Sequence, residues 1–316
     1  MSMETGGGAN GIRRIEAGNA VSWFTRAVDV GGRQAKGLFT AAALGVAAMA
    51  ALFIVAGLFV SILMAAGMAP GEKPDFSRTL MLLLPLIVLI SALMPVFAGG
   101  MQQVLHHAEE GRPVTATDVF AGITGGRFWA LAGLAIIPLA SLALTLANYH
   151  VLGGPDYFAQ SVAVFEEAMQ GRQVAPPEPR APVLMFLAGL GINALQTVLQ
   201  LITVPLVQLS RRGTLGAIAD GFRMMARNPG AVLVALALFL VASIILGLVL
   251  GVGLVILALL AGLVPLLGVP LLLVVMFAVA VLLFVVYNGL CYYAWRDQFA
   301  APGPEAAPAP PASLEV

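Results

Sequence analysis

The sequence from Ala231 to Trp295 reads AVLVALALFLVASIILGLVLGVGLVILALLAGLVPLLGVPLLLVVMFAVAVLLFVVYNGLCYYAW and contains no charged residue across 65 positions. A soluble domain cannot hide such a segment, because each of its surface helices needs one polar face toward water. About 20 helical residues cross the hydrocarbon core of a bilayer, so the segment is long enough for two spans. Pro265, Gly268 and Pro270 predict the turn between them. The stretch therefore predicts a membrane protein.

The composition of the whole chain agrees with this prediction. Of its 316 residues, 60% are hydrophobic and 10% are charged, and the mean hydropathy is +0.96. Soluble domains average about 25% charged residues. The formal net charge is zero, so we expect no nucleic-acid partner. Three histidines and one cysteine, Cys291, are too few for a closed zinc site, and we expect neither a metal nor a cofactor.

Six charge-free runs have the length of a membrane span. They are Leu38–Met68, Leu80–Met101, Phe128–Tyr149, Pro182–Leu209, Ala231–Leu263 and Leu271–Tyr293. Only helices and closed barrels satisfy the backbone in lipid, and these runs lack the polar–apolar alternation of barrel strands. The sequence thus predicts an all-α bundle of six spans over residues 13–299. A Gly-rich tail, 1–12, and a Pro/Ala-rich tail, 300–316, are predicted to be disordered.

The basic residues predict the orientation of the bundle. Twelve of the sixteen lie in the N-terminal segment, in the second–third and fourth–fifth connections, and after the last span, and four lie on the other side. Cytoplasmic loops carry an excess of Lys and Arg. We therefore expect an inner-membrane protein with both termini in the cytoplasm.

Three cytoplasmic segments that precede the first, third and fifth spans resemble one another. They are Ala20–Arg33, Val114–Arg127 and Thr214–Gly230. Each combines apolar residues at helical spacing with one acidic residue and a basic residue near the next span. This pattern predicts short amphipathic helices in the headgroup layer, with arginines that contact lipid phosphates. Those arginines are Arg33, Arg127, Arg223 and Arg227.

The likeness of these segments has two interpretations. One is a threefold repeat of short helix, span and span, which could enclose a central cavity. The other is that any cytoplasmic linker between spans tends to be amphipathic and basic. Thr115 and Asp118 are candidate helix caps in the segment before the third span, and Thr214 is one in the segment before the fifth span.

Polar side chains follow one face of the fourth predicted span. Asn193, Gln196 and Gln200 stand at positions i, i+3 and i+7 of a helix, and Gln208 lies close to the same side. Carboxamides in hydrocarbon are costly unless they are paired, so this stripe should face the interior of the bundle. It is either the lining of a polar pathway or lipid-headgroup pocket, or a set of interhelical hydrogen bonds worth about 0.6 kcal/mol each. The second interpretation is the favoured one.

Several smaller features predict packing and anchoring. Gly247 and Gly251 have the spacing of close helix packing, inside the chain or in a homodimer. An aromatic belt that anchors the chain at the cytoplasmic membrane surface is predicted from Tyr287, Tyr292, Tyr293 and Trp295. The long third–fourth loop, 150–181, predicts a short helix over Tyr157–Met169 and could cap the outer mouth of the bundle.

Several short motifs resemble an uncharacterised bacterial family of six-span inner-membrane proteins. They are Leu93-Met-Pro-Val-Phe-Ala-Gly-Gly-Met101, Glu110-Gly-Arg-Pro-Val114, Asp118-Val-Phe-Ala-Gly122, Ala219-Asp-Gly-Phe-Arg223 with Arg227-Asn-Pro229, and Ala294-Trp-Arg-Asp-Gln-Phe299. That family is distantly similar to the membrane domain ahead of some glycerophosphodiester phosphodiesterases. The resemblance covers 13–299 and implies the same six-span fold. It implies no catalytic residues, and the long third–fourth loop departs from the family's pattern.

Three classes of function compete for such a bundle: a structural or adaptor protein, an uncoupled transporter or lipid-handling protein, and a membrane enzyme. No Ser/His/Asp arrangement and no charged residue inside a span could act as acid or base, so we expect no catalytic residues and no enzyme. The same observation argues against ion-coupled transport. We predict a structural or adaptor role, with membrane lipids, other membrane proteins or further copies of the chain as partners. Uncoupled transport or lipid handling is the alternative.

Overall fold

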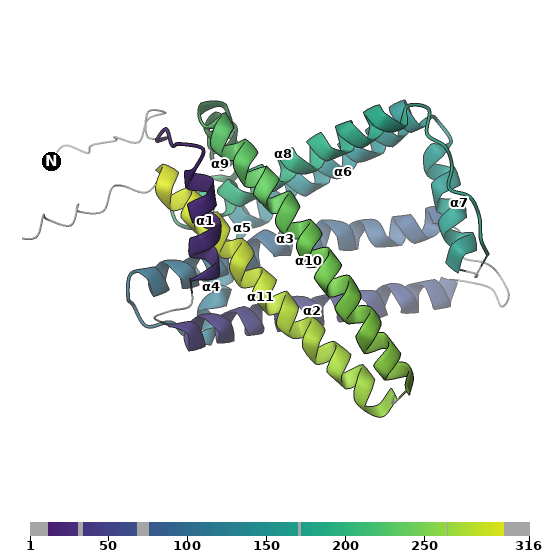
Figure 1. Ribbon diagram of the computed structural model, residues 1–316, viewed down its shortest axis with the longest axis horizontal. Coiled ribbons are helices and arrows are strands. Elements are labelled where there is room, and N and C mark those ends of the chain that lie inside the picture. The colour runs from purple at the N-terminus through teal and green to yellow at the C-terminus, as the bar shows by residue number, and fades with distance from the viewer. Residues whose placement is uncertain (1–11, 31–33, 68–75, 170–171, 264, 300–316) are drawn as a thin grey trace, which may run out of the picture.

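A computed structural model describes residues 12–30, 34–67, 76–169, 172–263 and 265–299 (Figure 1). Every regular element in this part of the chain is helical, which confirms the all-α fold. The elements are α1 (Asn19–Val28), α2 (Ala35–Gly67), α3 (Phe76–Glu109), η1 (Ala116–Phe120), α4 (Ala121–Thr124), α5 (Phe128–Ala132), η2 (Gly133–Ala135), α6 (Ile136–Asn148), η3 (Tyr149–Gly153), α7 (Tyr157–Met169), α8 (Pro182–Gln208), α9 (Thr214–Arg227), α10 (Pro229–Leu263) and α11 (Pro265–Phe299).

Six helical segments are long and apolar enough to cross a membrane, which confirms the predicted number of spans. Their bounds are Ala35–Leu63, Leu83–Glu109, Phe128–Gly153, Pro182–Gln208, Pro229–Val255 and Gly268–Phe299. Large apolar side chains cover their outer surfaces; Leu248 is 67% exposed and Leu273 is 65% exposed. Such surfaces are stable in hydrocarbon and costly in water, which makes the chain a multi-pass membrane protein.

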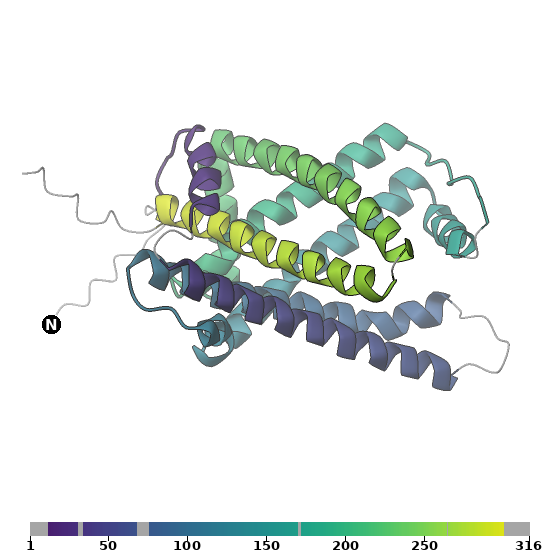
Figure 2. The ribbon, with the colours of Figure 1, turned by 60° about the horizontal axis from the view of Figure 1, so that its bottom comes forward.

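The spans form three helical hairpins (Figures 1 and 2): α2 with α3, α5 and α6 with α8, and α10 with α11. The short helices α1, α4 and α9 lie together at one end of the bundle, which also holds both ends of the described chain. The helix α7 lies at the opposite end, with the bounds predicted from the sequence. We call the two ends the short-helix end and the α7 end.

Each short segment packs against a hairpin other than the one that follows it in the sequence. The helix α1 contacts α11 and α10, the η1–α4 segment contacts α3, and α9 contacts α8. Two of these crossings are very close: a methyl group on Gly100 would lie 1.7 Å from the Val119 carbonyl oxygen, and one on Gly289 would lie 3.1 Å from the Ala27 Cβ. The architecture therefore has the threefold order of short helix, span and span that the sequence suggested.

The second helix of each hairpin contributes to a central core. The helices α3, α8 and α11 all contact one another, whereas α2, α6 and α10 lie farther out. The most deeply buried side chains are on the central helices, toward the short-helix end. Examples are Met101 and Leu105 on α3, Ile202 and Leu206 on α8, and Leu290 on α11.

Two prolines change the predicted helix boundaries. The helix α10 ends at Leu263 and α11 begins at Pro265, so Gly268 and Pro270 lie inside α11. The last helix therefore begins at Pro265, earlier than predicted, because proline is tolerated in the first turn. The third span is interrupted by η2, which ends three residues before Pro138. That proline lacks the N–H that would bond to the Leu134 carbonyl, and its ring crowds this carbonyl, so the chain tightens there.

The aromatic residues at the end of α11 are buried, so the predicted lipid-facing belt is wrong. Tyr292 and Tyr293 are each 3% exposed. The Tyr293 hydroxyl donates to Glu109 at 2.7 Å, and Trp295 Nε1 donates to Ser210 at 2.8 Å. These side chains tie α11 to α3 and to the segment after α8, because their polar tips find protein partners there.

Three smaller predictions differ from the structure. A methyl group on Gly247 or Gly251 would meet nothing within 4 Å, so this pair does not pack against another helix of the described chain. The Thr214 hydroxyl donates to the Ala130 carbonyl at 2.8 Å and does not cap α9. Ile12, the last residue of the predicted N-terminal tail, is buried, and the rest of both predicted tails lies outside the described residues.

Candidate binding cavity

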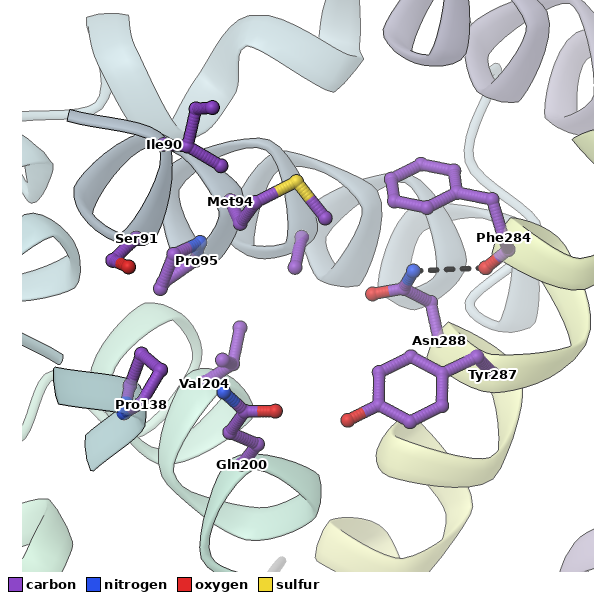
Figure 3. A pocket seen from close by; sticks show the side chains of 11 residues that line it. Ile90, Ser91, Met94, Pro95, Pro138, Gln200, Val204, Phe284, Tyr287 and Asn288 are labelled. Carbon is purple, nitrogen blue, oxygen red and sulfur yellow. Dashed lines mark hydrogen bonds between the residues drawn. The ribbon is translucent and has the colours of Figure 1, made fainter. Parts of the chain in front are cut away.

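A cavity of about 250 Å³ lies between the central helices α3, α8 and α11, with one contribution from α6 (Figure 3). The lining residues are Ile90, Ser91, Met94, Pro95, Ala98, Pro138, Gln200, Val204, Phe284, Tyr287 and Asn288. Met94 at its rim is 43% exposed on a membrane-spanning helix. The cavity therefore has an edge toward lipid and a mostly apolar wall.

Proline shapes two sides of this cavity. Pro95 stands four residues after Ser91 and has no N–H, so it cannot donate the helical hydrogen bond to the Ser91 carbonyl. Pro138 lines the opposite wall from α6. Each proline ring replaces a regular backbone hydrogen bond with a kink or a tightened turn. The cavity thus lies where two helices deviate from ideal geometry.

Three polar side chains face the space from two helices. In Figure 3 the Tyr287 hydroxyl and the Gln200 carboxamide point toward one another across the cavity. Both side chains are half-buried, and the Gln200 carboxamide has no hydrogen bond to another described residue. Asn288 lies beside them and is 1% exposed. The cavity thus has four polar side chains, of which three lie on α8 and α11 and the fourth, Ser91, lies on α3.

The orientation of Asn288 is fixed by two hydrogen bonds. Its Nδ2 donates to the Phe284 carbonyl at 2.8 Å, and its Oδ1 accepts from Gln102 Nε2 at 3.0 Å. Gln102 is fully buried, and its own Oε1 has no partner among the described residues. A buried acceptor left unpaired costs about 1–3 kcal/mol. The Gln102–Asn288 pair between α3 and α11 thus costs free energy of folding that apolar side chains would not cost.

The predicted polar stripe of α8 is divided between different surroundings. Gln200 lines the cavity, and Gln208 is buried, with Nε2 3.5 Å from Gln103 Oε1 and its own Oε1 unpaired. Asn193 is exposed and donates to the Gly189 carbonyl of its own helix at 2.8 Å. Gln196 is half-buried and does not line the cavity. Toward the α7 end α8 runs beside α6 and away from α11, which separates these side chains (Figure 1).

The predicted lipid-contacting arginines also lie in different surroundings. Arg127 Nη1 donates to the Arg211 carbonyl at 3.2 Å, and Arg223 pairs with Asp220 at 2.9 Å. Arg227 is exposed at the end of α9. Arg33 lies outside the described residues.

Sequence reasoning missed Asn288, Gln102 and Ser91. A signal for Asn288 was present, since it is the only carboxamide in the 65-residue charge-free run. Gln102 gave no such signal because it lies near the end of its span, where polar residues are common. Its pairing with Asn288 joins positions 186 residues apart, which no local pattern reveals.

The histidine and glutamate residues in the last turn of α3 and directly after it serve as packing partners. His106 Nε2 lies 3.3 Å from Glu110, and its Nδ1 lies 3.3 Å from the Tyr292 hydroxyl. Across the described ranges, no three His, Cys, Asp or Glu side chains are close enough together to hold a metal ion. Gly111 ends the helix with φ of 70°, as a C-terminal glycine does.

No protein-family model matches this chain, and no curated protein or solved structure matches it. The resemblance to a six-span family therefore stays a prediction from short motifs.

Proposed function

We propose that this multi-pass membrane protein binds a small neutral amphiphile in the cavity between α3, α6, α8 and α11, without enzymatic turnover. The observation that carries the proposal is a mostly apolar space of about 250 Å³ with an edge toward lipid and with three of its four polar side chains on α8 and α11. An amphiphile combines the same two properties. Its polar group would lie near Gln200, Tyr287 and Asn288, and its apolar part near Met94 and Ile90.

The choice of a neutral ligand follows from the lining. None of the lining residues is charged, while amide, hydroxyl and carbonyl groups supply both donors and acceptors. An ion would lose its hydration in this space without gaining a countercharge. A hydroxyl- or amide-bearing molecule instead exchanges its water hydrogen bonds for hydrogen bonds to the wall. We therefore favour lipid or small-solute handling over the adaptor role that the sequence favoured.

The same lining supports a non-enzymatic role. General acid–base catalysis uses a side chain that gains and loses a proton near neutral pH, most often His, Asp or Glu. Tyr287 is the one lining residue with an ionisable proton, and a phenol of this kind stays protonated at neutral pH. Binding or passage of a solute requires no such group.

We place the protein in a bacterial inner membrane with the short-helix end in the cytoplasm. The argument is the excess of basic residues at that end, including Arg26, Arg127 and Arg223. Both ends of the described chain lie there as well, as six spans require.

A crosslinking experiment tests the proposed ligand class. The full chain in lipid nanodiscs is irradiated with a photoreactive diacylglycerol as the neutral amphiphile, and labelled peptides are counted by mass spectrometry. We expect labelling next to Met94, reduced at least fivefold by Gln200→Leu and by Tyr287→Phe. The matched control is Asn193→Leu, which replaces a carboxamide of the same helix outside the cavity.

Two outcomes would contradict the proposal. Equal labelling of wild type, Gln200→Leu and Asn193→Leu would show that the cavity side chains do not bind the probe. Loss of folded protein in Gln200→Leu, with normal yield of Asn193→Leu, would show that Gln200 serves helix packing. The second outcome would favour the structural or adaptor role.

A further inference from the structure

At the short-helix end the Arg127 side chain contacts the backbone of Arg211, and neither arginine has an acidic partner among the described residues. Arg127 Nη1 donates to the Arg211 carbonyl at 3.2 Å, and Arg211 is exposed. Among the described residues, no carboxylate pairs with either guanidinium, although Asp220 nearby pairs with Arg212 at 3.2 Å and with Arg223 at 2.9 Å. One aspartate thus serves two arginines, and the Arg127–Arg211 pair adds positive charge beside them.

The backbone of Arg211 has an unusual conformation. Its φ is 55°, and no other non-glycine residue of the described chain has a positive φ. The left-handed region brings the Cβ of an L-residue close to the following carbonyl and favours glycine or asparagine. Backbone strain of this kind is frequent where a side chain has a binding role. The turn between α8 and α9 therefore displays an arginine at some cost in backbone energy.

Exposed apolar side chains lie on α5 and α9, the two helices that follow these arginines along the chain. Trp129, two residues after Arg127, is 83% exposed, and Leu215 in the first turn of α9 is 75% exposed. The Thr214 hydroxyl donates to the Ala130 carbonyl at 2.8 Å, which holds the start of α9 against α5. Tryptophan with its ring in the boundary region is typical of membrane interfaces.

The depth of the pair agrees with the position of lipid headgroups. One candidate span begins at Phe128 and another ends at Gln208, so Arg127 and Arg211 both lie just beyond the hydrocarbon boundary. The planar guanidinium matches two oxygens of a phosphate group, and two guanidinium groups together attract a negatively charged lipid more than a zwitterionic one.

We propose that the Arg127–Arg211 pair binds the phosphate of an anionic phospholipid, with Trp129 and Leu215 against the upper part of its acyl chains. This site is separate from the cavity and does not depend on what the cavity binds. Arg223, whose guanidinium is held by Asp220, is not part of it.

Native mass spectrometry of the full chain tests the site. Protein in detergent is incubated with equal amounts of phosphatidylglycerol and phosphatidylcholine, and the retained lipids are counted. We expect wild type to retain phosphatidylglycerol preferentially, and Arg127→Gln with Arg211→Gln to reduce this retention at least tenfold. The control combines Arg223→Gln with Arg227→Gln, which removes the same charge from α9 and should change retention less than twofold.

A glycine variant separates binding from folding. Arg211→Gly relieves the left-handed conformation, so it should keep or raise the melting temperature while it lowers phosphatidylglycerol retention. Equal losses in both double variants would show diffuse attraction by net charge and would overturn the site. Unchanged retention in Arg127→Gln with Arg211→Gln would overturn it too. Inorganic phosphate and phosphatidylglycerol are also compared for the rise in melting temperature that each gives to wild type. An equal rise with inorganic phosphate would overturn the assignment to a lipid.

Discussion

The short-helix end and the α7 end of this bundle are both built from apolar helices, yet they are held together differently. Near the short helices, buried side chains link segments far apart in sequence; Asn228 alone contacts the chain at Arg13, Ile15 and Gln298. Toward the α7 end, side chains such as Leu259 face outward, and the helices run mainly in pairs. In lipid no hydrophobic force drives helices together. Polar ties and close contacts near the water boundary therefore fix the relative positions of the three hairpins.

The largest expected effect comes from a methyl group added at one end or the other. Gly100→Ala places a Cβ 1.7 Å from the Val119 carbonyl oxygen, so the η1–α4 segment must move away from α3. Overpacking of this kind costs about 1–3 kcal/mol and sometimes more, and we expect the upper end of that range. Gly57→Ala, in the half of α2 toward the α7 end and with nothing within 4 Å of the added methyl group, should stabilise its helix by about 0.5–1 kcal/mol. Thermal unfolding in detergent measures both, and equal melting temperatures would abolish the distinction between the two ends.

A smaller effect should follow from the removal of one carboxamide. Asn228 is 2% exposed; its Oδ1 accepts from the Ile15 backbone N–H at 3.0 Å, and its Nδ2 donates to the Arg13 carbonyl at 3.0 Å. Asn228→Ala should cost about 2–3 kcal/mol, because each lost hydrogen bond contributes about 1 kcal/mol and leaves a buried group unpaired.

Asn193→Ala is the matched control for that variant. Asn193 is exposed and bonds only to its own helix, so its loss should change the free energy of unfolding by less than about 0.5 kcal/mol. If the two alanine variants unfold alike, the polar ties of the short-helix end contribute nothing specific.

The smallest expected effect concerns the ion pair between α1 and α11. Asp297 accepts from Trp23 Nε1 at 2.9 Å and pairs with Arg26, whose guanidinium carbon also lies 4.7 Å from the centre of the Tyr293 ring. Asp297→Asn keeps the shape of the side chain and removes the charge, so we expect a loss of about 1 kcal/mol. The loss should shrink as salt is raised from low to high concentration, since the pair is partly exposed. A loss that is independent of salt would assign the stabilisation to the Trp23 hydrogen bond.

The sequence predicts the spans well because the hydrocarbon core of a bilayer requires each helix to have about 20 apolar residues without charge. The bounds of α7 and the glycine at the end of α3 also follow from local patterns, which tertiary contacts reinforce. The cavity does not follow, because it depends on which helices meet; Gln102 and Asn288 are 186 residues apart. Helical periodicity places Asn193 and Gln200 on similar faces of α8, but it cannot show that the helix leaves the core between them.

The central claim is that the chain has six spans with the short helices at one end. The accessibility of single cysteines from the two sides of the membrane tests this claim most directly. Single cysteines replace Thr25, Ile123 or Phe165, all exposed, in a Cys291→Ser background, and intact vesicles are treated with a membrane-impermeant maleimide. We predict that the cysteines at 25 and 123 react from one side and the cysteine at 165 from the other. Reaction of all three from the same side would contradict the six-span arrangement.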